Sequence, residues 1–213
     1  MEPMESFKDR IAFTLKSGLL CAAMLMPVVT LAHSQEESDA DTSVVSSSSA
    51  SENPAADSMV ENPAYRQKTE SLSRHIQRKY NVPASKADRI VAEAIRNGER
   101  HQMEPELILA IIAVESTFKE RAVSRVGARG LMQVLPGSHA RKMREIGGSH
   151  QLFDPVKNIH TGSRILVSYL NAHSGDLRRA LLSYNGSLHL RRSSFPDKVM
   201  RIYRDFRSVT VEG

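Results

Sequence analysis

Eight consecutive apolar residues, Leu107 to Val114, constrain the fold of this chain more than any other feature. Pro105 precedes the run and suits the first turn of a helix, while Glu104 and Glu106 suit the positive end of the helix dipole. A helix that is apolar on every side must be buried, and eight residues are too few to cross a membrane. The sequence therefore predicts a central helix that begins near Pro105 and is surrounded by other elements.

Apolar residues also recur at helical spacing on both sides of this run, whereas strand-like alternation is scarce. The first stripe covers residues 86–100, and we expect Ser85 to cap that helix. Further helices are expected over residues 137–146, 155–171, 176–184 and 196–206. We therefore predict a mostly α-helical domain with little or no β-structure over residues 71–208, followed by a short tail at 209–213.

The first 32 residues have the order of a secretory signal peptide. Lys8, Arg10 and Lys16 precede an apolar stretch over residues 18–32. This stretch ends in residues that are small or that a signal peptidase tolerates at its cleavage site. An uncleaved N-terminal membrane anchor remains the alternative. Cys21, the single cysteine of the chain, falls inside this segment, so the chain can form no internal disulfide.

Charge divides the rest of the chain into two parts. Residues 33–70 are rich in serine and carry two basic and eight acidic side chains, and we predict a disordered linker there. Residues 71–213 carry 24 basic and 13 acidic side chains, a net charge of +11. A basic domain suits an anionic polymer, which leaves nucleic acid, a membrane surface and the bacterial cell wall open.

Glu115 is the first candidate functional residue, because it stands at the end of the apolar run. Burial and the negative end of the helix dipole would both raise the pKa of its carboxyl group, as a general acid requires. Taken alone, a glutamate at the end of a helix more often points into solvent than takes part in catalysis.

Two further segments carry polar groups near expected turns. The segment 127–133 has two glycines three residues apart, which suggests a tight loop that brings backbone close to a ligand. It lacks the Lys-Ser/Thr pair of a phosphate loop. The segment 183–186 ends a helix, and its tyrosine and asparagine could stack on a sugar and hydrogen-bond to it. Each segment alone is also typical of an ordinary turn.

Taken together and in order, these segments resemble the catalytic domain of soluble lytic transglycosylases, the lysozyme-like family with an SLT domain. The resemblance covers about residues 90–205 and rests on Glu115-Ser116 with Phe118, Gly127-Ala128, Gly130-Leu131-Met132-Gln133 with Pro136, Asn158-Ile159 with Gly162, Tyr169-Leu170, the segment from Ala180 to Asn185, and Phe195-Pro196 with Val199 and Tyr203. Arg129, Ser183 and the Gly186-Ser187 pair depart from the common pattern, which affects substrate detail rather than class.

The resemblance implies cleavage of the β-1,4 bond between N-acetylmuramic acid and N-acetylglucosamine without water, which leaves 1,6-anhydromuramoyl ends. Glu115 would act as the single acid and then base. Glu120 and Asp154 are the nearest candidates for a base that activates water, and both are interpreted as surface charges. Side chains that match the family's site lining are Ser116, Met132, Gln133, Tyr184 and Asn185. No cofactor is implied.

Two alternatives to this function remain open: a hydrolytic muramidase and a non-catalytic wall-binding protein. The histidines lack paired helical spacing, so no metal site is expected. The secretory signal and the absence of a base-reading motif argue against a nucleic-acid binder. The expected partners are peptidoglycan glycan strands, with cell-envelope machinery as a further candidate. The expected location is the periplasm or cell envelope, reached by secretion.

Overall fold

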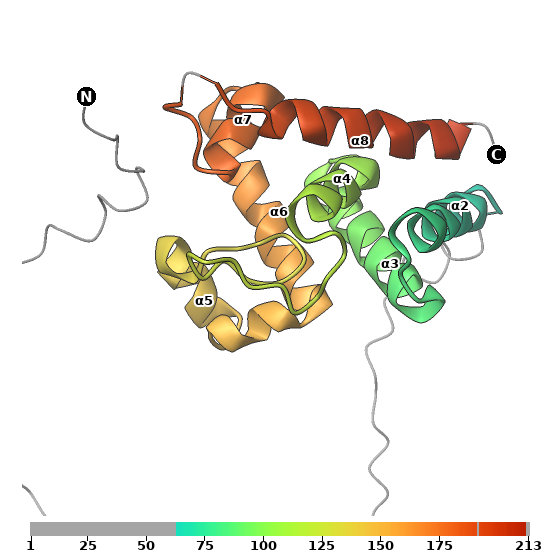
Figure 1. The fold of residues 1–213 in the computed structure, drawn as a ribbon, viewed down its shortest axis with the longest axis horizontal. Coiled ribbons are helices and arrows are strands. Elements are labelled where there is room, and N and C mark those ends of the chain that lie inside the picture. The colour runs from blue at the N-terminus through green and yellow to red at the C-terminus, as the bar shows by residue number, and fades with distance from the viewer. Residues whose placement is uncertain (1–62, 191, 212–213) are drawn as a thin grey trace, which may run out of the picture. The chain divides into compact units, whose positions relative to one another are not determined.

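The computed structural model describes residues 63–190 and 192–211, which belong to one compact unit (Figure 1). The predicted signal peptide and most of the predicted linker lie outside the described residues. Within the described part, the elements are α2 (Pro63–Tyr80), α3 (Ala84–His101), α4 (Pro105–Ser116), η2 (Pro136–His139), α5 (Ala140–Glu145), η3 (Ser149–Phe153), α6 (Pro155–Ala172), α7 (Leu177–Tyr184) and α8 (Phe195–Val211).

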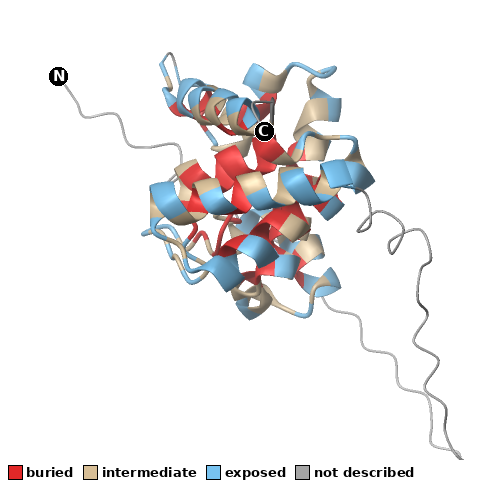
Figure 2. Cartoon of the chain, turned by 90° about the vertical axis from the view of Figure 1, so that its right-hand side faces the viewer, coloured by how far each residue is buried: buried red, intermediate tan, exposed pale blue. Residues whose placement is uncertain are grey.

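The expected fold class is confirmed, since helices dominate and the described residues contain no β-strand. The central helix is also confirmed: α4 starts at Pro105, and every residue from Glu106 to Ala113 is buried. Helix α4 packs against α3 and, most extensively, against α8 (Figure 1). The buried positions gather where the helices meet, so the core surrounds α4 as the apolar run requires (Figure 2).

A long irregular segment joins α4 to η2 and carries the predicted glycine loop. Two isolated β-bridges fold it back on itself, one between Val123 and Arg129 and the other between Arg129 and Val134. Below this segment a second, small core forms from Val134, Met143, Leu152 and Ile165. Helix α6 touches both cores, since Ile159 and Leu166 belong to the main one. It therefore connects the irregular segment to the helical body.

The structure corrects two expected domain boundaries. Helix α2 begins at Pro63 rather than near residue 71, because the buried stripe of Leu72 and Ile76 extends two turns back to the partly buried Tyr65. The last eight residues assigned to the linker are therefore helical. At the other end α8 continues to Val211, beyond the expected limit of 208.

The expected cap of α3 is also wrong. The helix begins at Ala84, and the carbonyl oxygen of Pro83 accepts the N–H groups of Lys86 and Ala87 at 3.0 Å. The fixed φ of Pro83, −57°, starts the helix without a side-chain cap, so Ser85 lies exposed inside the first turn.

Candidate active site

Glu115 is the penultimate residue of α4, and it is partly exposed, whereas the helix before it is buried. Thr117 ends the helix in the left-handed conformation, with φ 52°, and its N–H donates to the carbonyl oxygen of Ala113 at 3.2 Å. The carboxyl group thus lies where the core reaches the surface, at the negative end of the helix dipole.

The residues that follow Glu115 fix the end of the helix. Ser116 is buried, and its hydroxyl donates to the carbonyl oxygen of Ile112 at 3.1 Å. Phe118 is buried and packs its ring against Tyr80 of α2, with 4.8 Å between ring centroids. The side chains of Ser116 and Phe118 therefore hold the backbone that directly follows Glu115 in place.

Three non-glycine residues near the predicted motifs adopt positive φ: Thr117 at 52°, Phe118 at 61° and Gln133 at 47°. The left-handed region costs an ordinary residue about 1–2 kcal/mol, and such strain gathers at functional sites. Here it turns the chain sharply after Glu115 and again at the end of the glycine loop.

Gly130 is the tightest point of that loop. Its φ is +75°, and a Cβ atom there would overlap the carbonyl oxygen of Leu152 and the side-chain amide of Asn158. Gly127, by contrast, has φ +85° but open space around it. The first glycine therefore serves the turn alone, whereas the second lets the loop lie directly on η3 and α6.

Asn158 of α6 holds the loop, a role that was not predicted although Asn158 lies in one of the matching motifs. Its Oδ1 accepts the N–H of Met132 at 2.8 Å, and its Nδ2 donates to the carbonyl oxygens of Arg129 at 2.9 Å and Leu152 at 2.8 Å. The amide is 1% exposed, so these three bonds satisfy a buried polar group. The available signal was an asparagine at helical spacing from the apolar Ile165.

Met132 and Gln133, two predicted site residues, both contribute to the loop itself. Met132 is fully buried, and a Cβ atom added to Gly162 of α6 would come within 2.8 Å of its Cβ. The Gln133 side chain donates to the carbonyl oxygens of Gly130 at 2.9 Å and Ala122 at 3.2 Å. The two side chains therefore shape the loop, and Gln133 remains partly exposed.

Tyr184, at the end of α7, joins the loop to the candidate acid. Its hydroxyl donates to the carbonyl oxygen of Met132 at 2.8 Å. Burial raises the pKa of this phenol well above its usual 10, and the charge of Glu115 raises it further. The structure thus brings Glu115, Met132 and Tyr184 together, with a phenol that stays protonated beside the carboxylate.

Asn185, the last predicted site residue, follows Tyr184 as the cap of α7. Its backbone N–H donates to the carbonyl oxygen of Leu181 at 3.1 Å, and its side chain is partly exposed. Gly186 then turns the chain with φ +72°. Asn185 is therefore held at the surface next to Tyr184, where a ligand can reach it.

Arg129, which departs from the family pattern, points toward η3. Its Nη1 donates to the Ser149 hydroxyl at 3.1 Å, and its guanidinium lies 5.7 Å from the centre of the Phe153 ring. Arg121 lies at the same distance from that ring. The two cations flank one aromatic side chain, and Arg129 braces the loop from the side of η3.

The described residues contain no group of histidine, cysteine and carboxylate side chains that could hold a metal ion. None of their helices is both long and apolar enough to span a bilayer.

The fold and the site define a class: a helical domain that presents a glutamate from the end of a buried helix near a partly buried tyrosine. Residues 93–195 match the family model described as the transglycosylase SLT domain. Over those residues the chain is therefore similar to the family that the sequence motifs indicated.

Curated relatives agree in name. The chain is 33% identical over 107 residues to the "Transglycosylase" of Enterobacteria phage PRD1, which covers 48% of this chain and 38% of that one. It is 36% identical over 104 residues to the "Membrane-bound lytic murein transglycosylase C" of Edwardsiella ictaluri, covering 43% and 29%. The matches therefore span well under half of each relative's length.

Among solved structures, the chain is similar to an inactive mutant of the lytic transglycosylase Slt from Pseudomonas aeruginosa. The sequences are 26% identical, the TM-score is 0.45, and the match covers 57% of this chain and 23% of that one.

Proposed function

We propose that this protein is a peptidoglycan lytic transglycosylase that cleaves the β-1,4 bond between N-acetylmuramic acid and N-acetylglucosamine. Glu115 is its acid and base, and the products carry 1,6-anhydromuramoyl ends. The observation that carries the proposal is the position of Glu115 at the end of buried α4, beside the protonated phenol of Tyr184, inside an SLT domain.

The proposed reaction starts with Glu115 in its carboxylic acid form. Its proton passes to the glycosidic oxygen, and the bond from that oxygen to the anomeric carbon of the muramic acid breaks. The acetamido oxygen of the same sugar stabilises the anomeric centre. The Glu115 carboxylate then takes the proton of the 6-hydroxyl, whose oxygen bonds to the anomeric carbon. Glu115 ends protonated and no water is consumed.

The positions of the nearest other carboxylates support a single catalytic carboxyl group. Most glycosidases use two, of which one activates water or attacks the sugar. Glu120 instead pairs with Lys86, with 3.1 Å between Oε2 and Nζ. Asp154 caps α6 by accepting the N–H of Lys157 at 3.0 Å, and it pairs with Arg89 at 3.2 Å. Both carboxylates are engaged in structural interactions, which favours the transglycosylase over the hydrolytic muramidase.

Tyr184 and Asn185 have supporting roles in this proposal. Tyr184 fixes the loop through Met132 and keeps its proton, so it does not compete with Glu115 as a base. Asn185 is exposed enough to bind a sugar acetamido group. Gln133, at the end of the glycine loop, is also partly exposed. Ser116 and Met132 hold the backbone that carries Glu115 and the loop.

The decisive experiment is mass spectrometry of purified peptidoglycan digested by the wild type and by Glu115→Gln. We expect anhydromuramoyl ends from the wild type and a loss of about 10²–10⁴-fold in rate for the variant. Glu120→Gln is the matched control and should keep its activity. Reducing ends would identify a muramidase, and an unaffected Glu115→Gln variant with wall binding would identify a non-catalytic protein.

We further propose that the enzyme works in the cell envelope, where its substrate lies. The segment over residues 1–32 has the order of a secretory signal. Fractionation of cells producing the full chain tests this, and cytoplasmic recovery would contradict it. Comparing the N-terminal mass of the recovered protein with that of the full chain shows whether the segment is cleaved or kept as an anchor.

A further inference from the structure

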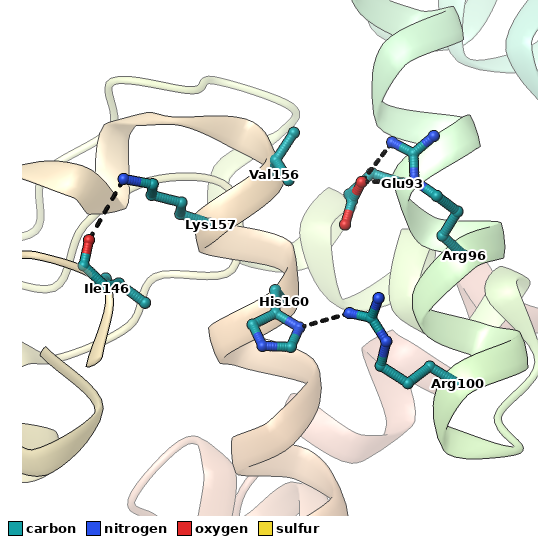
Figure 3. A pocket seen from close by; sticks show the side chains of 7 residues that line it. All are labelled: Glu93, Arg96, Arg100, Ile146, Val156, Lys157 and His160. Carbon is teal, nitrogen blue, oxygen red and sulfur yellow. Dashed lines mark hydrogen bonds and ion pairs between the residues drawn. The ribbon is translucent and has the colours of Figure 1, made fainter. Parts of the chain in front are cut away.

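A groove of about 480 Å³ lies between α3 and α6, and none of its lining residues belongs to the predicted active site. Glu93, Arg96 and Arg100 line it from α3, and Val156, Lys157 and His160 line it from α6, with Ile146 at one side (Figure 3). The groove therefore combines three cationic side chains with one carboxylate and two aliphatic ones.

The carboxylate of the groove, that of Glu93, already binds side chains of its own helix. Glu93 is buried, and its Oε1 accepts Nδ2 of Asn97 at 2.6 Å. Its Oε2 accepts Nε of Arg96 at 2.9 Å and forms an ion pair with the same guanidinium. Glu93 and Arg96 thus neutralise each other, which leaves the charges of Arg100 and Lys157.

Arg100 and Lys157 bond to neutral acceptors within the described chain. Nη1 of Arg100 donates to Nδ1 of His160 at 3.1 Å, and Nζ of Lys157 donates to Oε1 of Gln151 at 2.8 Å. A guanidinium can only donate, so this contact requires an unprotonated Nδ1 on His160. Burial, followed by the charge of Arg100, lowers the pKa of His160, which keeps the ring neutral. Arg100 uses one of its N–H donors in this way and keeps the others for a ligand. Nζ of Lys157 also donates to the carbonyl oxygen of Ile146 at 3.4 Å, so it keeps one donor and its charge for a ligand.

The two cations lie at different ends of the groove. Arg100 reaches from α3 toward His160, whereas Lys157 extends along the other side of α6 toward Ile146 (Figure 3). Val156 is 40% exposed and is one of the few large aliphatic side chains so exposed in the described chain. Separated cations with aliphatic contacts suit a short peptide that carries more than one carboxylate.

We propose that this groove binds the carboxylate-bearing peptide stems that hang from peptidoglycan strands. Arg100 and Lys157 each bind a carboxylate, and Val156 and Ile146 contact short aliphatic side chains between them. The identity of the peptide source rests on the proposed function, whereas the preference for an acidic peptide rests on the groove alone. Binding the stem outside the catalytic site would retain the enzyme on peptide-bearing strands.

The test measures calorimetric binding of stem peptides, released from purified peptidoglycan by an amidase, to the full-length protein. We expect measurable binding that falls about tenfold or more when the peptide carboxylates are converted to amides, because charge-assisted hydrogen bonds are lost. The double variant Arg100→Gln, Lys157→Gln should weaken binding to a similar degree. Arg201→Gln, Arg204→Gln on exposed positions of α8 removes the same charge and should bind like the wild type.

Equal binding by the two double variants, or equal binding of amidated and native peptides, would overturn the proposal. Binding of anionic lipid vesicles through Arg100 and Lys157, without binding of stem peptides, would assign the groove to a membrane instead. Thermal melting of each variant shows whether it is folded. The outcomes separate from the proposed function, because Glu115-dependent cleavage without stem binding refutes only the groove, and stem binding without cleavage refutes only the enzyme.

Discussion

The Tyr184 hydroxyl donates a 2.8 Å hydrogen bond to the carbonyl oxygen of Met132, which joins α7 to the glycine loop across 52 residues of chain. Met132 is fully buried and its N–H is bound by Asn158, so both backbone groups of this residue are bonded to side chains from other elements. The loop between α4 and η2, which has no regular structure of its own, is therefore positioned by α6 and α7.

Removing the hydroxyl in Tyr184→Phe should destabilise the protein by about 1–3 kcal/mol, because the Met132 carbonyl then lacks its partner in a buried place. Peptidoglycan cleavage should fall as well, because the glycine loop loses the hydrogen bond that holds it near Glu115. Urea denaturation and a turbidity assay measure the two effects. Tyr203→Phe is the control, because its hydroxyl bonds to the exposed Glu104 and its loss should cost less.

Two glycines of one loop should respond differently to the same substitution. Gly127→Ala introduces a left-handed alanine into open space and should cost roughly 1 kcal/mol. Gly130→Ala adds overlap with Leu152 and Asn158 and should cost about 3 kcal/mol or more. Denaturant midpoints of the two variants test this, and equal losses would show that backbone strain alone matters at both positions.

Asn158→Ala should be among the most damaging substitutions on α6, at about 3 kcal/mol or more, because it leaves the buried N–H of Met132 and the carbonyl oxygen of Leu152 without partners. The Arg129 carbonyl oxygen keeps one partner, the N–H of Val134 at 3.1 Å. Asn158→Asp keeps the acceptor for the Met132 N–H but turns a carboxylate toward two carbonyl oxygens, so it should also destabilise near neutral pH. Chemical denaturation measures both variants. Asn171→Ala, at an exposed position of the same helix, should be nearly neutral, and an equal loss there would contradict the assignment.

Asp205 of α8 gives the stability a specific pH dependence. Burial raises the pKa of its carboxyl group, but hydrogen bonds from Lys79 and His75 of α2 outweigh that effect, and the pKa falls below its usual 3.8. Because the pKa of Asp205 is lower in the folded than in the unfolded protein, the ionised carboxylate stabilises the fold at pH values above the unfolded-state pKa. This stabilisation is lost as the pH falls through the folded-state pKa. Wild-type stability should therefore drop more than that of Asp205→Asn in acid. Parallel curves of unfolding free energy against pH would refute this link between α2 and α8.

The sequence predicted the elements whose pattern is local. The apolar run identified buried α4, and the stripes on α3, α6, α7 and α8 placed these helices to within a few residues. It did not predict the start of α2, because only Leu72 and Ile76 bury large apolar side chains in a helix that is otherwise polar. It also mistook Ser85 for a cap, since Pro83 begins α3 through its backbone.

The contacts among the residues of the candidate site could not be predicted from the sequence. The resemblance placed Glu115 and Tyr184 in one site, and burial and the charge of Glu115 both raise the pKa of the Tyr184 phenol. The bonds of Tyr184 to Met132 and of Asn158 to three backbone groups join residues far apart in the chain, and no local pattern encodes such pairs. The groove between α3 and α6 was not predicted for the same reason, because its cations come from two separate helices.

The packing of α2 and α8 onto the core sets a limit on how this protein can be divided. Both helices lie essentially outside residues 93–195, yet Leu72 and Ile76 of one and Val199 and Phe206 of the other are fully buried in the main core. A polypeptide trimmed to the matching residues would expose the sides of α4 that α8 covers, and it should aggregate rather than fold. We therefore expect the cooperative folding unit to be larger than the region that matches the family model and to include both flanking helices.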